Sequence, residues 1–128
     1  MSRDYRKLHV FQIADDLVPR IYNVTKDFPA EERFGLQAQL RRAAVSVACN
    51  IVEGSARRSG HEYLNFLNIA AGSAAEARYL LELSDRLGFV SEGQRDKLMG
   101  DYTKLIGSLQ SLIRALGGSV AKPLSPEP

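Results

Sequence analysis

The sequence predicts an all-α protein, an up-down-up-down antiparallel four-helix bundle. Long segments carry apolar residues at steps of three and four, which is the spacing of one helix face. Glycine or proline separates these segments, and no stretch shows the alternation typical of a strand. A length of 128 residues suits one domain, which we place at residues 1–120. The proline-rich residues 121–128 are expected to form a disordered C-terminal tail.

The first helix is predicted over residues 8–25. Pro19 lies inside it, removes one backbone donor, and is expected to kink the helix or restart it there. The predicted apolar face consists of Leu8, Phe11, Ala14, Val18, Ile21 and Thr25.

The second helix is predicted over residues 30–57. Pro29 suits its first turn, and Glu31 and Glu32 place negative charge at the positive end of the helix dipole. Cys49 is expected to be a buried, unreactive thiol, and a single cysteine excludes both an internal disulfide and a cysteine-based zinc site. The predicted apolar stripe consists of Leu36, Leu40, Ala44, Val47 and Ile51.

The third helix is predicted over residues 60–87. Ser59 and Glu62 have the spacing of a capping box, and Gly88 suits a left-handed C-terminal cap. Residues 70–77 are unusually small, and small side chains allow another helix to approach closely. Replacing Gly72 with leucine is therefore expected to disrupt folding or assembly.

The fourth helix is predicted over residues 92–116, with Ser91 and Gln94 as a capping box and Gly117 and Gly118 ending it. Its leucine-rich positions step by four and three, as in a heptad seam. These positions are Leu98, Tyr102, Leu105, Leu109, Leu112 and Leu116.

A polar stripe follows one face of the second helix, and two polar residues of the third helix could face it. These residues are Gln39, Arg42, Ser46, Asn50 and Glu53, with Ser73 and Glu76 on the third helix. The stripe has three interpretations: a solvated face, a structural polar network, or a ligand or catalytic site. We favour a buried network in which Arg42 pairs with Glu53 or Glu76, because such a network specifies the packing register.

Catalytic patterns are missing from the sequence. His9 and His61 are not preceded by glutamate three residues earlier, as a di-iron carboxylate site requires. The sequence lacks a phosphate-binding loop and a metalloprotease motif, and helix spacing places no histidine beside Ser46 or Ser73. We therefore expect no enzyme, no cofactor and no metal. The charged N-terminus and the absence of a membrane-length apolar run predict a cytoplasmic protein without a membrane partner.

Four sequence motifs carry a resemblance to a known family: Phe28-Pro-Ala-Glu-Glu-Arg-Phe-Gly-Leu-Gln37, Gln39-Leu-Arg-Arg-Ala-Ala-Val-Ser46, Asn50-Ile-Val-Glu-Gly54, and Ile69-Ala-Ala-Gly-Ser73 followed by Glu76. Over residues 8–116 the chain resembles the four helix bundle protein family, also called the 23S rRNA intervening-sequence proteins. The resemblance implies a bacterial antiparallel bundle, commonly a homopentameric ring, without established enzymatic activity. Some members are encoded inside insertions in bacterial 23S rRNA genes, and a distant relative assists a reverse transcriptase. Phe11 departs from the tryptophan of many relatives.

One end of such a bundle collects positive charge, although the formal net charge is only +2. We expect this end to bind RNA or DNA weakly and without sequence preference, with Tyr5 and Tyr63 stacking on unpaired bases. Solvating side chains are the alternative, and Arg57 and Arg58 also suit a helix C-terminus. The basic residues are Arg3, Arg6, Lys7, Arg57, Arg58, His61 and Lys122, against Asp4 and Glu62.

A protein–protein interaction scaffold with no nucleic-acid role is the alternative function. Its partner would bind an exposed helix face of the assembled ring. Four aromatic residues could contribute to such a face, and periodicity leaves open whether they point inward or outward. These residues are Tyr22, Phe28, Phe89 and Tyr102.

Overall fold

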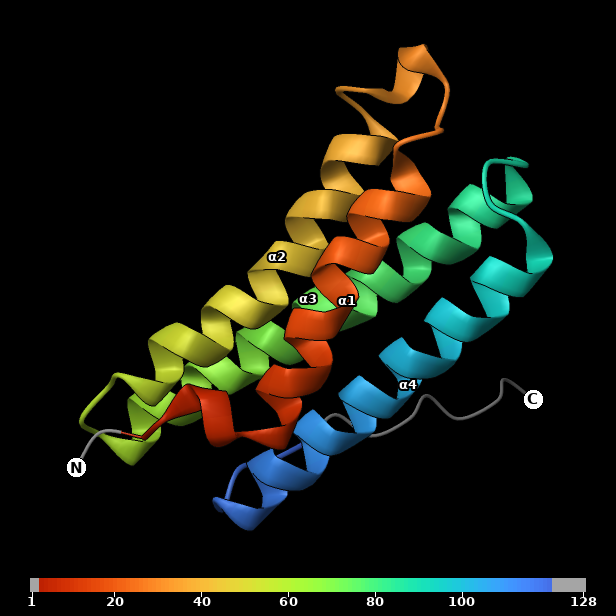
Figure 1. The fold of residues 1–128 in the computed structure, drawn as a ribbon. Coiled ribbons are helices and arrows are strands. Elements are labelled where there is room, and N and C mark those ends of the chain that lie inside the picture. The colour runs from red at the N-terminus through yellow and green to blue at the C-terminus, as the bar shows by residue number, and fades with distance from the viewer. Residues whose placement is uncertain (1–2, 121–128) are drawn as a thin grey trace, which may run out of the picture.

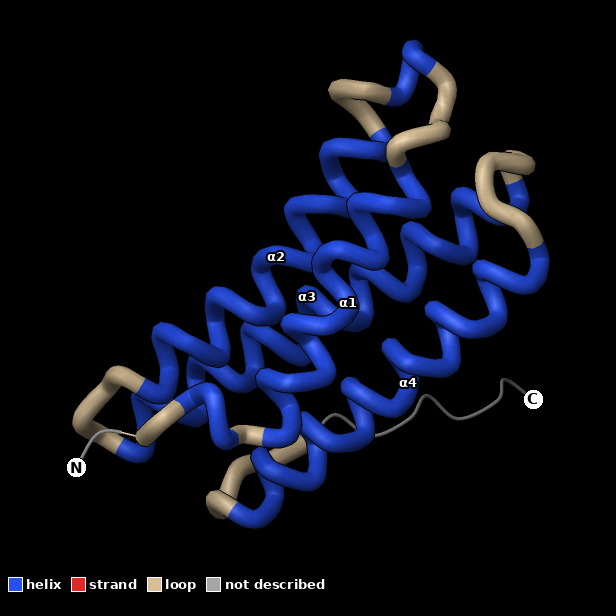
Figure 2. The backbone as a smooth tube through the Cα atoms, viewed as in Figure 1, coloured by secondary structure: helices blue, strands red, loops and turns tan. Residues whose placement is uncertain are grey.

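A computed structural model describes residues 3–120, and within them all regular structure is helical (Figures 1 and 2). The prediction of an all-helical fold with four long helices is confirmed for this part of the chain. The predicted tail at 121–128 lies outside the described residues. In chain order the elements are η1 (Tyr5–Lys7), α1 (His9–Thr25), η2 (Ala30–Glu32), α2 (Leu36–Ser55), α3 (Gly60–Arg86) and α4 (Glu92–Ala115).

The four long helices pack in a cycle around one core. α2 and α3 share the most extensive seam, α1 and α4 the least extensive, and α3 packs against α4 as α1 does against α2. This packing is that of a bundle. Large side chains that are fully buried at its centre come from all four helices and include Leu17, Ile21, Leu40, Ile51, Leu67, Leu81, Leu105 and Leu109.

α1 runs without interruption from His9 to Thr25, so of the two predicted effects of Pro19, a kink or a restart, the restart is wrong. Pro19 is exposed, and its ring is therefore accommodated on the solvent side of the helix. The buried face is also rotated from the predicted one. Phe11 is only half-buried, and its ring packs on Tyr5 of η1 with the centroids 4.8 Å apart. The buried residues of α1 are Val10, Ala14, Leu17, Ile21, Val24 and Thr25.

α2 begins at Leu36, six residues later than predicted, and ends at Ser55. The segment after Pro29 forms only the short 3-10 helix η2, because Gly35 adopts a non-helical conformation with φ −105° and ψ −111°. Glu32 caps the new start, since its Oε1 accepts a hydrogen bond from the Leu36 backbone nitrogen at 3.0 Å.

Helix ends follow the predicted capping chemistry closely. Ser91 and Gln94 form the full capping box, whereas Ser59 accepts from the Glu62 backbone without the reciprocal side-chain bond. Gly88 takes the left-handed conformation, with φ +80°. The seam of α4 differs at its end: Leu116 is 42% exposed, and Ile113 is buried in its place.

The close approach of α2 and α3 occurs at Gly54, not at Gly72. A Cβ at Gly54 would lie 2.8 Å from Cβ of Phe66, whereas a Cβ at Gly72 would have no atom within 4 Å. Within the chain, the predicted packing role of Gly72 is therefore wrong, because this residue faces outward from α3.

Candidate nucleic-acid interface

The segment before α1 lies across the turn between α2 and α3 (Figure 1). The Arg3 backbone nitrogen donates to the Ser55 carbonyl at 3.3 Å, and Arg3 Nη1 donates to the Arg57 carbonyl at 3.0 Å. Asp4 caps η1 by accepting from the Arg6 backbone nitrogen at 3.1 Å. The structure thus joins the segments that carry Arg3, Arg6 and Arg57, which are distant in sequence.

The end of α4 meets the start of α3 close to this turn. A Cβ at Gly118 would lie 2.9 Å from Leu64 Cδ2. We call the surface of η1, the α2–α3 turn and the first turn of α3 the basic end. Its residues are Arg3, Arg6, Lys7, Arg57, Arg58 and His61. Lys122, predicted to join them, lies outside the described residues.

Three guanidinium groups of the basic end lie over aromatic rings. The Cζ of Arg3 is 4.0 Å from the Tyr63 ring centroid, and the Cζ of Arg57 is 4.8 Å from the Phe66 ring centroid. Arg6 lies over Tyr5, 4.9 Å from its centroid. Burial raises the pKa of the Tyr63 phenol, and the positive charge of Arg3 opposes that shift.

The burial of Tyr63 contradicts the predicted stacking of a base on its ring, and two contacts limit access to Tyr5. The Tyr63 ring is only 2% exposed and is covered by Arg3. Tyr5 is half-buried, with Phe11 against its ring and Arg6 above it. The prediction failed because the amphipathic pattern does not show which cation will cover a given ring.

The cations of the basic end have no carboxylate within 4.0 Å in the described part of the chain. Elsewhere, carboxylates neutralise arginines: Arg20 contacts Asp101 at 2.6 Å and Asp16 at 2.9 Å. Arg95 similarly contacts an aspartate at 3.2 Å. Since Arg6, Lys7, Arg57 and Arg58 are also exposed, the positive charge of this end faces solvent.

The polar stripe forms a short chain of hydrogen bonds between α2 and α3. Ser46 and Ser73 hydroxyls lie 2.9 Å apart, and Asn50 Nδ2 donates to the Ser46 carbonyl at 2.8 Å. Gln39 Nε2 donates to Glu76 Oε2 at 3.3 Å. Of the predicted residues, Gln39 and Ser46 of α2 therefore bond to Glu76 and Ser73 of α3, whereas Asn50 bonds within α2.

The arginine pairing expected within this stripe does not form. Arg42 makes no ion pair with Glu53 or Glu76, and all three side chains are exposed. Cys49 is exposed as well, so the prediction of a buried thiol is wrong. It is two residues from Val47 and Ile51, which places it about 200° around the helix from the buried stripe.

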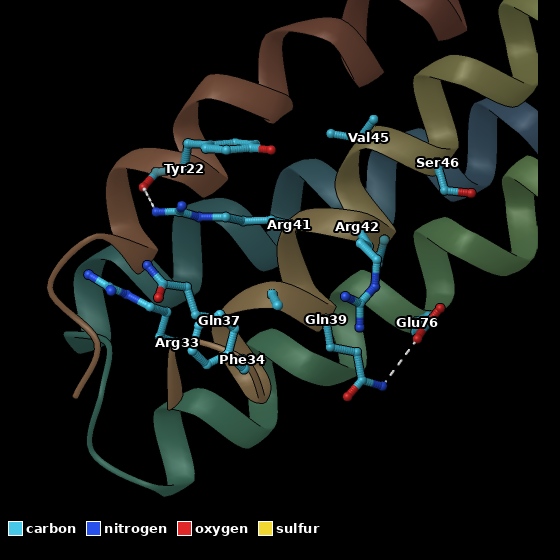
Figure 3. Close-up of a pocket in the computed structure, with 12 residues that line it drawn as sticks. Tyr22, Arg33, Phe34, Gln37, Gln39, Arg41, Arg42, Val45, Ser46 and Glu76 are labelled. Carbon is cyan, nitrogen blue, oxygen red and sulfur yellow. Dashed lines mark hydrogen bonds between the residues drawn. The ribbon is translucent and has the colours of Figure 1, made fainter. Parts of the chain in front are cut away.

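An open groove that sequence analysis missed crosses the outer face of α2 (Figure 3). Phe34 stands at its rim and is 88% exposed. Arg41 lies over the Tyr22 ring at 4.5 Å, and its Nε donates to Thr25 Oγ1 at 2.8 Å. The exposure of Phe34 depends on the turn before α2, which helical periodicity did not reveal. Side chains lining the groove include Tyr22, Arg33, Phe34, Gln37, Gln39, Arg41, Arg42, Ser46 and Glu76.

Two features of the described residues bear on other functions. Within residues 3–120, no group of three or more histidine, cysteine, aspartate or glutamate side chains is placed to hold a metal ion. No helix in the same region is long and apolar enough to cross a membrane.

A family model described as 23S rRNA-intervening sequence protein matches residues 6–111. The chain belongs to this family. The resemblance found in the motifs of α2 and α3 is thereby confirmed. The chain is also similar to a solved structure, a protein of unknown function from the S23 ribosomal protein family of Bacteroides thetaiotaomicron. That structure has 30% sequence identity and a TM-score of 0.76, and the match covers 82% of this chain and 95% of that chain. No curated protein matches.

Proposed function

We propose that this member of the 23S rRNA-intervening sequence protein family is a non-enzymatic, self-assembling bundle that binds RNA or DNA through its basic end. The exposed cations of that end carry the proposal, because within residues 3–120 none of them lies within 4.0 Å of a carboxylate, although Asp4 and Glu62 belong to the same segments. Each cation that reaches a phosphate releases counterions from the nucleic acid, and this release drives binding that is independent of sequence.

A single chain offers few cations, so its affinity is weak. These are Arg3, Arg6, Lys7, Arg57 and Arg58, with His61 beside them. Repetition of the basic end around a homopentameric ring would strengthen binding, because later contacts form at a high effective concentration. The proposal takes the helices in up-down-up-down order, which the short connections and the closed cycle of neighbouring helices support.

Self-assembly is supported by apolar side chains that the isolated chain leaves exposed. Phe34 is 88% exposed, and Ile69 and Tyr79 of α3 are 51% and 53% exposed. Another copy of the chain is the occupant we propose for this surface, since each copy would bury apolar area that now contacts water.

Salt-dependent binding to a structured RNA tests the nucleic-acid role. Fluorescence anisotropy at low salt is expected to show binding, and moderate salt is expected to weaken it. The double variant Arg57→Ala/Arg58→Ala should weaken binding and reduce the log–log salt slope by about one for each lost phosphate contact. Arg86→Ala is the matched control, because Arg86 is exposed at the far end of α3 and lies outside the basic end. Absence of binding at low salt, or unchanged binding by the double variant, would contradict the proposal.

A protein–protein scaffold without a nucleic-acid role is the second candidate, favoured by the groove beside Phe34 (Figure 3). Pull-down with and without nuclease separates the two. A partner retained after nuclease treatment supports the scaffold, whereas loss of all partners supports the nucleic-acid role.

A further inference from the structure

We infer that the basic end recognises the phosphodiester backbone and does not read unpaired bases, so that it accepts double-helical as well as single-stranded nucleic acid. This inference rests on the proposed function and names the chemistry of its ligand. It follows from what covers the aromatic rings at this end.

The aromatic rings of the basic end are engaged within the chain. Arg3 covers the buried Tyr63 ring, and Arg57 covers the half-buried Phe66 ring. Tyr5 contacts Phe11 on its edge and Arg6 on its face. A base that stacked on the ring face beneath one of these guanidinium groups would have to displace it, and so would remove a cation from the phosphate-binding surface.

Stacking leaves the donors of these arginines free. The five N–H groups of a guanidinium lie in its plane, so an arginine that lies flat on a ring can still bind phosphate through two parallel hydrogen bonds. Arg3 uses Nη1 for the Arg57 carbonyl, and its other donors remain. For Arg6 and Arg57 the structure shows no side-chain donor in use within the described residues.

The rings therefore act as supports for the cations. A guanidinium held over Phe66 loses less conformational freedom when it binds a phosphate than a free arginine does. Phe66 and Tyr63 are positioning residues in this scheme, because they touch the arginines and not the nucleic acid. Arg58, for which no such contact exists in the structure, supplies charge without this support.

His61 is the remaining ring of the basic end and is exposed in the first turn of α3. A histidine can stack on a base. A test of the inference must therefore separate stacking on His61 from binding to the backbone.

The test compares three labelled ligands of one length by anisotropy at low salt, using the full chain. They are a single strand, the same strand with abasic sugars throughout, and a duplex. One stacked base contributes about fivefold or more to affinity. We expect the abasic strand to bind as tightly as the base-bearing strand, and the duplex at least as tightly as either. A fivefold or greater weakening with the abasic strand would overturn the inference, whereas absence of binding to all three ligands would overturn the proposed function itself.

Two substitutions test the supporting role of the rings. Phe66→Leu is expected to weaken binding of the base-bearing and abasic strands by the same factor, with thermal melting showing that the variant is folded. Arg57→Lys keeps the charge on an exposed residue. We expect it to weaken the binding of both strands, because lysine lacks the planar guanidinium that binds phosphate through two parallel hydrogen bonds. His61→Ala should leave the ratio of the two affinities unchanged. Wild-type binding by both Phe66→Leu and Arg57→Lys, or a change in that ratio for His61→Ala, would overturn the inference.

Discussion

At the scale of single residues, Gly54 couples the packing of the bundle to the basic end. Its missing side chain lets α2 approach α3 where Tyr63 and Phe66 lie, and an added Cβ would be 3.2 Å from Tyr63 Cδ1. These two rings support Arg3 and Arg57. Space at a single α carbon therefore helps to fix where the rings beneath Arg3 and Arg57 lie.

Gly54→Ala is expected to lower the free energy of unfolding by about 1–3 kcal/mol, because the added methyl group overpacks the α2–α3 seam. Gly72→Ala is the matched control. It faces open space in α3 and should be neutral or stabilising by up to about 1 kcal/mol, since alanine favours helix over glycine. Urea denaturation measures both changes, and equal stability of the two variants would contradict the assignment of the close contact.

At the scale of elements, a side-chain cap marks the start of α2 at a place where continuous helix was predicted. Acidic residues after Pro29 predicted a helix from residue 30, but Gly35 breaks the backbone geometry before Leu36. The Glu32 carboxylate then accepts a hydrogen bond from the Leu36 backbone nitrogen, which has no partner within the helix, at 3.0 Å. The resulting turn carries Phe34 out to the rim of the groove.

Glu32→Ala is expected to destabilise the protein by about 1 kcal/mol, the usual effect of losing a side-chain cap at a helix N-terminus. Glu31→Ala removes the same charge from an exposed side chain of the same turn and serves as the control. The midpoint of urea unfolding should fall for Glu32→Ala alone. If both variants lost the same stability, general electrostatics and not the cap would be responsible.

At the scale of the whole molecule, the single chain leaves several large apolar side chains exposed, and self-assembly would bury them. The side chains of Phe34, Ile69 and Tyr79 are more exposed than a monomeric bundle requires. The half-buried hydrogen bond between Ser46 and Ser73 joins α2 to α3, the helix that also carries Ile69 and Tyr79. A neighbouring copy would bury both kinds of surface.

Light scattering is expected to give the mass of a pentamer for the native chain and a smaller mass for Phe34→Ser. The substitution removes an exposed apolar anchor without touching the core, so folding should survive it. Leu87→Ser is the control, since Leu87 is also exposed but follows the end of α3. A native monomer, or an unchanged mass for Phe34→Ser, would contradict this mode of assembly.

Much of the fold could be predicted because the responsible residues lie close together in the chain. The capping box of Ser91 and Gln94 and the left-handed Gly88 depend on neighbours within a few positions. The rotation of each helix was harder to predict. Cys49 lies among apolar residues yet faces outward, because the interior of the bundle selects only one side of α2.

The sequence by itself determined four helices, most of their ends, and the family, since local hydrogen bonding and apolar spacing specify these. Only the tertiary structure decided which ring each arginine covers and which polar pairs form. Arg3 and Arg57 are 54 positions apart, and their hydrogen bond exists only because η1 lies across the α2–α3 turn. Ion pairing likewise depends on distances between helices, and for this reason Arg42 remains without the glutamate partner that its spacing predicted.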